Sequence, residues 1–276
     1  MEAKKRASTV VIHLFLILGA CIMILPFAWM VLTSFKSVAE STSMNPFVIF
    51  PTSWKIGNYT EVIRQNDFAR LYFNTFSMMA LRVICSIVFS AMAAYAFARL
   101  QFPGRDFFFG LVLFQMMVPT QIFIIPQYLM VDAMGMRNTI FALLFPGIVS
   151  AFGTFLLRQF FMGLPKELEE AARLDGCNIG QTFLKVMLPL TRSGLVALSI
   201  FTALFGFKDL MWPMIVNTSS SAATLSSALA KIQSAYSVNY PELMAVSVLA
   251  ILPMMLIYML FQKQFIEGIA TSGGKL

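Results

Sequence analysis

Six stretches of the chain are apolar and close to the length that a helix needs to cross a lipid bilayer. They cover residues 10–32, 73–97, 107–130, 139–161, 193–216 and 243–261. A spanning helix needs about 20 mainly apolar residues, because backbone groups in lipid must be hydrogen-bonded within the segment. Charged residues make up only 12% of the chain, against about 25% in soluble domains. We therefore predict an all-α, polytopic membrane protein with six transmembrane helices in a single domain over residues 1–276.

Prolines lie inside several of these stretches and predict kinks in the helices. They are Pro26, Pro119, Pro126, Pro146 and Pro253. Membrane helices tolerate such prolines because neighbouring helices satisfy the freed backbone groups. The first stretch follows a basic start, but it is longer than the apolar core of a signal peptide and has no convincing cleavage site. We expect it to be an uncleaved span.

The distribution of lysine and arginine predicts which side of the membrane each loop faces, because cytoplasmic loops carry an excess of these residues. If the N-terminus lies inside, the inner segments hold Lys4, Lys5, Arg6, Arg99, Arg105, Arg158, Lys166, Arg173, Lys185, Arg192, Lys263 and Lys275, and the outer ones hold Lys36, Lys55, Arg64, Arg70, Arg137 and Lys231. This excess places both termini in the cytoplasm of a multi-pass protein of a bacterial inner membrane. Topology thus explains the net charge of +7, and we expect membrane lipid but no nucleic acid as a partner.

One polar segment, residues 164–190, lies between the fourth and fifth stretches. Pro165 suits the first position of a helix. Gly176 can adopt the left-handed conformation that ends a helix, and Asn178 can cap a second one, which Pro189 closes. Acidic side chains are favourable near the positive end of the helix dipole, and three follow Pro165, namely Glu167, Glu169 and Glu170. The pattern predicts a helix–turn–helix on the cytoplasmic face.

Two interpretations of this polar segment compete. An interfacial amphipathic connector would rest on lipid headgroups. The three acids weaken that interpretation, because anionic headgroups repel them. Ala171 and Ala172 are small enough to let the backbone of another protein approach closely. These residues favour a docking element.

The residues of this segment resemble the EAA motif of ABC importer permeases. The matching residues are Glu170, Ala171, Ala172, Asp175, Gly176, Phe183, Leu188 and Pro189, while Cys177 and Val186 depart from the usual Ala and Ile. Further stretches resemble the MalG-like permease subunits of carbohydrate-uptake importers, namely AAYAFARLQFPGR (93–105), MMVPTQIFIIPQYL (116–129) and TFLLRQFFMGLPKELEEAARLDG (154–176). The likeness covers nearly the whole chain.

The resemblance implies that residues 164–190 form the coupling helix, which sits in a cleft of a cytoplasmic ATPase dimer. By the motif, Glu170 would face a basic residue of the ATPase, and Gly176 would make the turn. The resemblance also implies a second, MalF-like permease subunit and an extracytoplasmic solute-binding protein, with a sugar or sugar-like solute carried by alternating access. Another ABC importer branch, which carries a phosphorylated polyol or another non-sugar solute, is the alternative.

Ionisable residues inside membrane spans are costly and often functional. Arg82 lies well inside the second stretch, and Lys208 and Asp209 lie toward the outer end of the fifth. Phe207-Lys208-Asp209 departs from the family's usual pattern, which has Asn in place of Lys208. A cationic cavity lining would favour an acidic or phosphorylated solute. Alternatively, Arg82 and Lys208 pair with acids of this chain or a partner, or extend toward the membrane surface.

Other polar residues in or between the spans allow two interpretations. Asn74 and Gln121 either face a solute pathway or bond to neighbouring helices, which is the commoner use. The outer segment 217–241 is either a solvated connector or, by the resemblance, a contact for the solute-binding protein.

Several chemistries lack the residues they need. The sequence contains no G-x-x-x-x-G-K-[ST], no H-E-x-x-H and no G-x-S-x-G. It has one histidine and no CxxC pair, so we expect no catalytic residues, no metal and no cofactor. ATP hydrolysis would belong to a separate ATPase subunit. A passive channel remains an alternative, but a channel has no need of a segment that docks an ATPase.

Overall fold

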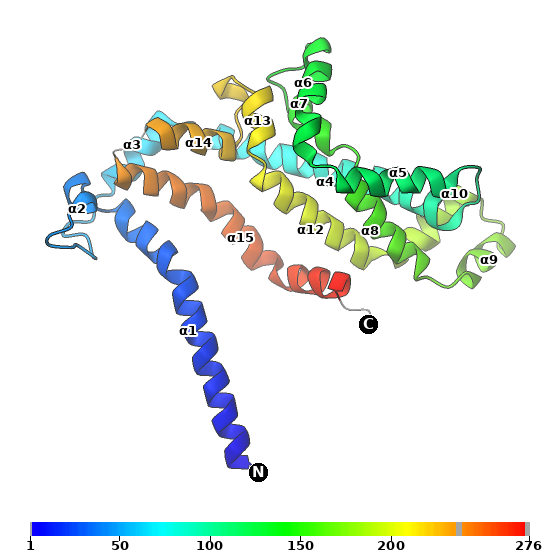
Figure 1. Cartoon of the computed structure of the whole chain (residues 1–276), viewed down its shortest axis with the longest axis horizontal. Helices are drawn as coiled ribbons and strands as arrows, with labels where there is room; N and C mark the ends of the chain where they lie inside the picture. Colours follow the sequence, from blue (N-terminus) through cyan, green and yellow to red (C-terminus); the bar gives the residue numbers. More distant parts are fainter. Residues whose placement is uncertain (1, 236–238, 274–276) are drawn as a thin grey trace. The chain divides into compact units, whose positions relative to one another are not determined.

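The described part of the chain, residues 2–235 and 239–273 of a computed structural model, is helical apart from one isolated bridge between Met44 and Phe47 (Figure 1). The α-helices are α1 (Glu2–Ser34), α2 (Val38–Thr42), α3 (Gly57–Gln65), α4 (Phe68–Arg99), α5 (Arg105–Met117), α6 (Ile124–Ala133), α7 (Ile140–Leu144), α8 (Ala151–Met162), α9 (Glu167–Leu174), α10 (Ile179–Thr182), α11 (Leu188–Leu190), α12 (Arg192–Lys208), α13 (Met211–Val216), α14 (Leu225–Ala235) and α15 (Tyr240–Gly273). Short turns of other helix types are η1 (Thr120–Phe123), η2 (Phe145–Gly147), η3 (Phe183–Met187) and η4 (Ser220–Ala222). The all-α prediction is confirmed.

The chain divides into two compact units, which we describe separately. One unit comprises Met1–Phe68 and Leu229–Met255, and the other comprises Ala69–Ala228 and Leu256–Leu276. The single membrane domain therefore stays a prediction. Among the basic residues used to predict orientation, Lys275 and the side chains of Lys4, Lys5 and Arg6 lie outside the described residues.

Three helices are long and apolar enough to cross a membrane without interruption. They are Thr9–Ser34 within α1, α4, and Tyr240–Met259 within α15. Three further spans arise only if each pair of bent helices is counted as one, so the six-span arrangement stays a prediction. Pro26 and Pro253 lie inside α1 and α15, neither of which they interrupt.

The other expected spans are broken helices. The stretch 107–130 divides near Pro119, where the pair Arg105–Met117 and Thr120–Ala133 bends by 100°. The stretch 139–161 divides at η2, which contains Pro146, with a bend of 49°. The stretch 193–216 ends its first helix at Lys208, and α13 begins only at Met211. These three stretches are thus not continuous helices, although the kinks expected at Pro119 and Pro146 are present.

In the unit that contains α1, the C-terminal end of this helix is fixed to the segment after it. The Lys36 ammonium donates to the carbonyl oxygen of Val48 at 2.7 Å and lies 3.9 Å from the centre of the Trp29 ring. Asn58 Nδ2 donates to the carbonyl oxygens of Ser34 and Lys36 at 2.8 and 3.0 Å. Burial lowers the pKa of Lys36. The segment after α1, which contains α2 and α3, is therefore held in place by specific contacts.

The second unit contains two apolar clusters, and α4 contributes to both. One cluster joins α4, α8, η3 and α12 through Ala91, Ala94, Tyr95, Leu156, Leu157, Phe161, Met187, Ala197 and Leu198. The other joins α4, α6, α7 and α13 through Met78, Met79, Val131, Ala142, Leu143, Trp212 and Val216. The first cluster supports the polar segment after α8, and the second supports the broken ends of the fourth and fifth stretches.

Candidate functional site

The polar segment after α8 begins with α9, an eight-residue helix with an exposed acidic start. The glutamates Glu167, Glu169 and Glu170 all lie in its first turn. Helix α9 begins at Glu167 with Lys166 as its N-cap, so the expected helix start at Pro165 is wrong by two residues. The side chains of Glu170 and Ala171 are exposed, which leaves this face of the helix open for contact.

Gly176 ends α9 in a left-handed conformation, as predicted, with φ +81°. The amide of Gly176 donates to the carbonyl oxygen of Arg173 at 3.0 Å, and the amide of Cys177 donates to that of Ala172 at 2.9 Å. This pair of bonds is the Schellman arrangement, in which two otherwise free carbonyls at a helix end are satisfied. Asp175, also a residue of the motif, is the exposed C-cap of the helix. The turn therefore has a defined geometry that depends on glycine.

Asn178 caps the second helix of the segment, also as predicted. Its Oδ1 accepts from the amide of Gln181 at 2.9 Å, and Gln181 Oε1 accepts from the amide of Asn178 at 2.9 Å. The helical run 179–190 includes the π-helical turn η3, and it bends by 76° into α12. Leu188 and Pro189 lie in α11, directly before this bend, with Leu188 half-buried and Pro189 exposed.

The second half of the segment is fixed to the spans by aromatic packing. Phe183 lies 5.1 Å from the ring of Tyr95 on α4 and 6.3 Å from that of Phe161 on α8, measured between ring centres. Met187 is fully buried in the same cluster, and Leu188 packs against it. The polar segment is thus packed directly against α4 and α8.

Ala172 is placed differently from the expectation. It is only 5% exposed within the chain, so it does not offer another protein a close approach, whereas its neighbour Ala171 does. Leu174, the last residue of α9, is instead 89% exposed.

Charged side chains surround a hollow of about 410 Å³ beside α9. Its charged lining residues are Arg99, Arg105, Lys166, Glu169, Glu170 and Arg173. Arg99 Nη2 donates to the carbonyl oxygens of Phe161 and Leu164, which ties the end of α4 to the end of α8. The end of α4, the start of α5 and the polar segment therefore meet at the same side of this unit.

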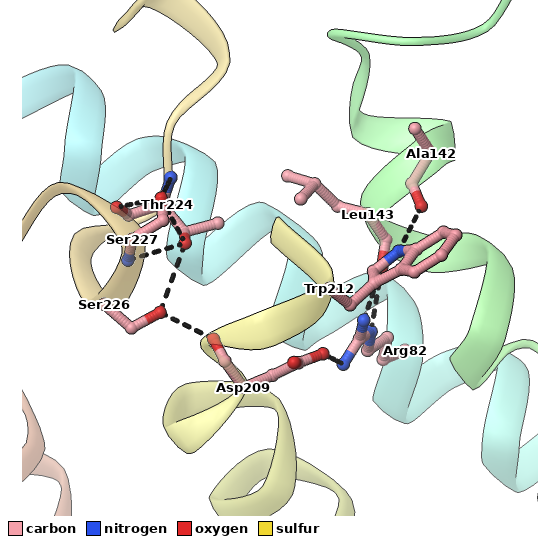
Figure 2. A network of polar contacts seen from close by, with 8 residues as sticks. All are labelled: Arg82, Ala142, Leu143, Asp209, Trp212, Thr224, Ser226 and Ser227. Atoms are coloured by element: carbon pink, nitrogen blue, oxygen red, sulfur yellow. Dashed lines mark hydrogen bonds and ion pairs between the residues drawn. The ribbon is translucent and has the colours of Figure 1, made fainter. Parts of the chain in front are cut away.

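A second site surrounds Arg82, which is 6% exposed within α4. Its Nε and Nη2 donate to the carbonyl oxygen of Leu143 at 3.1 and 2.6 Å, and its Nη1 forms an ion pair with Asp209 Oδ2 at 2.9 Å. Figure 2 shows this guanidinium between Leu143, at the end of α7, and Asp209, at the break between α12 and α13. The interpretation in which Arg82 pairs with an acid of its own chain is confirmed.

The same network fixes both breaks to their surroundings (Figure 2). Trp212 Nε1 donates to the carbonyl oxygen of Ala142 at 2.8 Å. Ser226 Oγ donates to the backbone carbonyl oxygen of Asp209 at 2.6 Å. Side chains thus donate to the carbonyl oxygens of Ala142, Leu143 and Asp209, which lie at or next to the ends of two helices, where carbonyls lack a partner within the helix.

The other polar residues considered for a solute pathway lie elsewhere. Asn74 is buried and donates to the carbonyl oxygens of Ser221 and Ala223 at 3.0 and 2.9 Å, so it anchors the outer segment to α4. Gln121 is exposed on η1. Lys208 is exposed and forms no ion pair with any residue that the structure describes.

A cavity of about 400 Å³ lies beside Arg82. Residues from α4, α5, η1, η2, α8 and α12 line it, namely Arg82, Ser86, Gln115, Met116, Val118, Thr120, Pro146, Gly147, Val149, Ser150, Ala151, Phe152, Thr202, Phe205 and Gly206. Of the five residues expected on a pathway, this cavity includes Arg82 alone. The neutral polar residues Ser86, Gln115 and Thr202 were missed, because single hydroxyl and amide residues in apolar stretches carry no distinctive spacing.

Comparison with known proteins supports the resemblance. A family model described as "Binding-protein-dependent transport system inner membrane component" matches residues 86–270. The arabinooligosaccharides transport system permease protein AraQ of Halalkalibacterium halodurans is 34% identical, over 98% of this chain and 99% of that protein. The diacetylchitobiose uptake system permease protein NgcG of Streptomyces coelicolor is 31% identical, over 95% of this chain and 87% of that protein.

Proteins with charged solutes in their names or titles are also similar to this chain. The sn-glycerol-3-phosphate transport system permease protein UgpE of Brucella suis is 30% identical over 99% of both chains. A chain from the crystal structure of a bacterial ABC transporter involved in the import of the acidic polysaccharide alginate matches 95% of this chain, with a TM-score of 0.80 and 25% identity. The chain therefore belongs to the family of binding-protein-dependent transport system inner membrane components, the permeases of ABC importers.

Proposed function

We propose that the chain is one of two permease subunits of an ATP-driven importer of a sugar or sugar-like solute. The relatives named for arabinooligosaccharides and diacetylchitobiose support the solute class. A cytoplasmic ATPase dimer supplies the energy, and an extracytoplasmic solute-binding protein delivers the solute. The observation that carries this proposal is the polar segment 164–190, which has an exposed acidic helix, a glycine turn and packed contacts to the spans.

The proposed coupling role rests on the two different halves of this segment, one exposed and one packed against the spans. Glu170, Ala171 and Leu174 are exposed and form the part that contacts the ATPase. Phe183 and Met187 are packed among α4, α8 and α12 and form the part that moves the spans. Gly176 and the Asn178 cap hold the two parts at a fixed angle. A desolvated charge pair between Glu170 and a basic residue of the ATPase would be costly to break from one side.

The charged hollow beside α9 supports the proposed orientation in the inner membrane. Arg99 and Arg105 come from one inner segment of the predicted topology, and Lys166 and Arg173 come from the next, and all four line one hollow. Such a concentration of basic residues is typical of the cytoplasmic side. We therefore assign the polar segment, and with it both termini, to the cytoplasm.

The surface of α1 supports a second permease subunit. None of the most apolar part of Thr9–Ser34 is buried within the chain. Lipid and a partner subunit are the two surroundings that would cover such a helix in a membrane. The cavity beside Arg82 is open on one side, since its lining residues Val149 and Phe205 are 61% and 65% exposed. A second permease would close it.

Reconstitution with the partner subunits tests the coupling role. Glu170→Lys reverses the charge that faces the ATPase, and Gly176→Val forces a β-branched residue into a left-handed turn, although no atom lies within 4 Å of an added Cβ. We expect both variants to reach the membrane in normal amounts and to lose ATP-dependent uptake. Gly180→Ala is the matched control, because its Cβ would meet only Asn178 Oδ1 at 3.5 Å.

Two results would contradict the proposal. If Glu170→Lys and Gly176→Val transported solute as well as the Gly180→Ala control, the segment would not couple the ATPase to the spans. If the chain purified without an ATPase and carried solute independently of ATP, the passive channel would be the better interpretation.

A further inference from the structure

The cavity beside Arg82 contains one cationic side chain, and the structure supplies its counter-charge. Arg82 is the sole charged residue among the described residues that line the cavity. Its Nη1 lies 2.9 Å from Asp209 Oδ2, and two of its other nitrogens donate to the carbonyl oxygen of Leu143. Asp209 itself does not line the cavity. The Asp209 carboxylate thus neutralises the Arg82 guanidinium from outside the cavity, and the remaining lining residues are neutral.

The neutral lining has the chemistry that recognises uncharged carbohydrate. Gln115 and Thr202 line the cavity with amide and hydroxyl groups, which both donate and accept hydrogen bonds as sugar hydroxyls do. Ser86 is buried behind them, and its hydroxyl accepts from the Thr202 hydroxyl at 3.4 Å. Phe152 and Phe205 line the same cavity, and the C–H faces of pyranose and furanose rings pack on aromatic side chains. Pockets of about 300–1,000 Å³ with mainly apolar walls and a few polar groups are typical of small-molecule sites.

We propose that this cavity takes an uncharged, hydroxyl-rich solute, and that Asp209 is the residue that sets this specificity by neutralising Arg82. The inference rests on the proposed function and narrows its solute class. Phosphorylated and acidic solutes are excluded because the cation that would attract them is already paired. This conclusion is opposite to the interpretation in which Arg82 and Lys208 make a cationic lining, since Arg82 is paired and Lys208 lies outside the cavity.

The charge of the cavity is measurable without transport. In the importer assembled with its partner subunits and without nucleotide, Cys21, Cys85 and Cys177 are replaced by alanine, and Val149→Cys places one thiol on an exposed part of the lining. The thiol is then modified with anionic sulfonatoethyl and cationic trimethylammonioethyl methanethiosulfonate. Rates are divided by that of the uncharged methyl reagent, which corrects for the thiolate fraction. Met44→Cys, 90% exposed on the outer segment, is the control position.

With Asp209 intact, we expect the anionic and cationic reagents to react at position 149 in nearly the ratio found for a free thiol. Asp209→Asn leaves Arg82 uncompensated, so this ratio should rise by about fivefold at position 149 and stay constant at position 44. Arg82→Gln combined with Asp209→Asn should return the ratio to its original value. A ratio already raised several-fold while Asp209 is intact would overturn the proposal, and that measurement does not depend on whether either variant folds.

Uptake separates this inference from the proposed function. We expect the assembled importer to show no ATP-dependent uptake of sn-glycerol 3-phosphate. ATP-dependent uptake of that anion would overturn the neutral-solute assignment and leave the importer function intact. ATP-independent entry of a neutral sugar such as arabinotriose would overturn the importer function while the neutral character of the cavity stood.

Discussion

Gly147 lies against the Arg82 side chain, so its replacement by alanine should destabilise the chain. A Cβ at position 147 would lie 2.9 Å from Arg82 Cδ and 3.0 Å from its Cγ. These separations are well below ordinary carbon–carbon contact, which is about 3.5–4.0 Å. The arginine cannot simply move aside, because its guanidinium is bonded to Leu143 and Asp209 at the same time. The added methyl group therefore has to displace either η2 or the ion pair.

The expected loss in the free energy of unfolding is the cost of overpacking minus the gain from replacing glycine by alanine. Overpacking of this kind costs about 1–3 kcal/mol, and loss of a hydrogen bond to a charged group costs about as much. Displacement of η2 and disruption of the ion pair are therefore both destabilising. Replacing glycine by alanine at a φ that alanine accepts stabilises the folded chain by about 0.4–1 kcal/mol, because it lowers the conformational entropy of the unfolded chain. The net loss is about 1–2 kcal/mol. For a chain of this size, that lowers the midpoint of thermal unfolding by about 2–8 °C.

Gly206 provides the matched control, since it faces the same arginine from α12. An added Cβ there would lie 3.5 Å from Met79 Cγ and 3.8 Å from Arg82 Cδ, which are ordinary contacts. Tryptophan fluorescence of the purified chain in detergent gives the midpoints of both alanine variants. In an Arg82→Ala background the clash is absent, so Gly147→Ala should then cost nothing. Equal midpoints for Gly147→Ala and Gly206→Ala, with arginine present, would refute the reasoning.

Two further predictions concern the outer segments. Asn74→Ala removes both hydrogen bonds to the 221–223 backbone, so we expect a loss of about 1–3 kcal/mol and faster proteolysis within residues 217–224; unchanged proteolysis would show that these bonds do not hold the segment. Hydrogen bonds from Ser37 and Thr52 lower the pKa of Glu40 from 4.5 to about 2. The stability that this carboxylate adds is therefore present above pH 4.5 and lost as the pH falls toward 2. Acid unfolding followed by fluorescence should show native and Glu40→Gln chains converging in that window, and a constant difference would contradict the assignment.

The parts of the fold that follow from local chemistry were predictable from the sequence. Apolar stretches gave the continuous helices α1, α4 and α15, because their length alone suffices to span a bilayer. Gly176 and Asn178 were correctly predicted at the turn of the polar segment, since a left-handed glycine and an N-cap depend on a few neighbouring residues. Pro119 and Pro146 likewise marked two of the three breaks.

The parts that depend on packing between distant residues were not predictable. The break after Lys208 lies before α13 and has no proline at its own position. It is accommodated because Arg82 and Ser226, far away in the sequence, bond to Asp209. Ala172 was assigned to a docking face because its size permits one, but the fold turns it inward. Asn74 was placed on a pathway because it is polar, whereas it holds an outer segment from 147 residues away.

The polar segment 164–190 and the cavity beside Arg82 both contact one helix, α4, and under the proposed function this helix would connect the two mechanically. Helix α4 carries Tyr95, which packs against Phe183 of the polar segment, and also Arg82, which holds the broken ends at Leu143 and Asp209. At 1.5 Å per residue the two lie about 20 Å apart along the helix. A continuous helix transmits displacement along its axis better than a broken one, and among the described helices that line the cavity α4 alone is long enough to span a membrane without a break. Under the proposed function, movement imposed on the polar segment therefore reaches the cavity through α4, while the breaks beside Arg82 supply the positions at which the cavity wall can change shape.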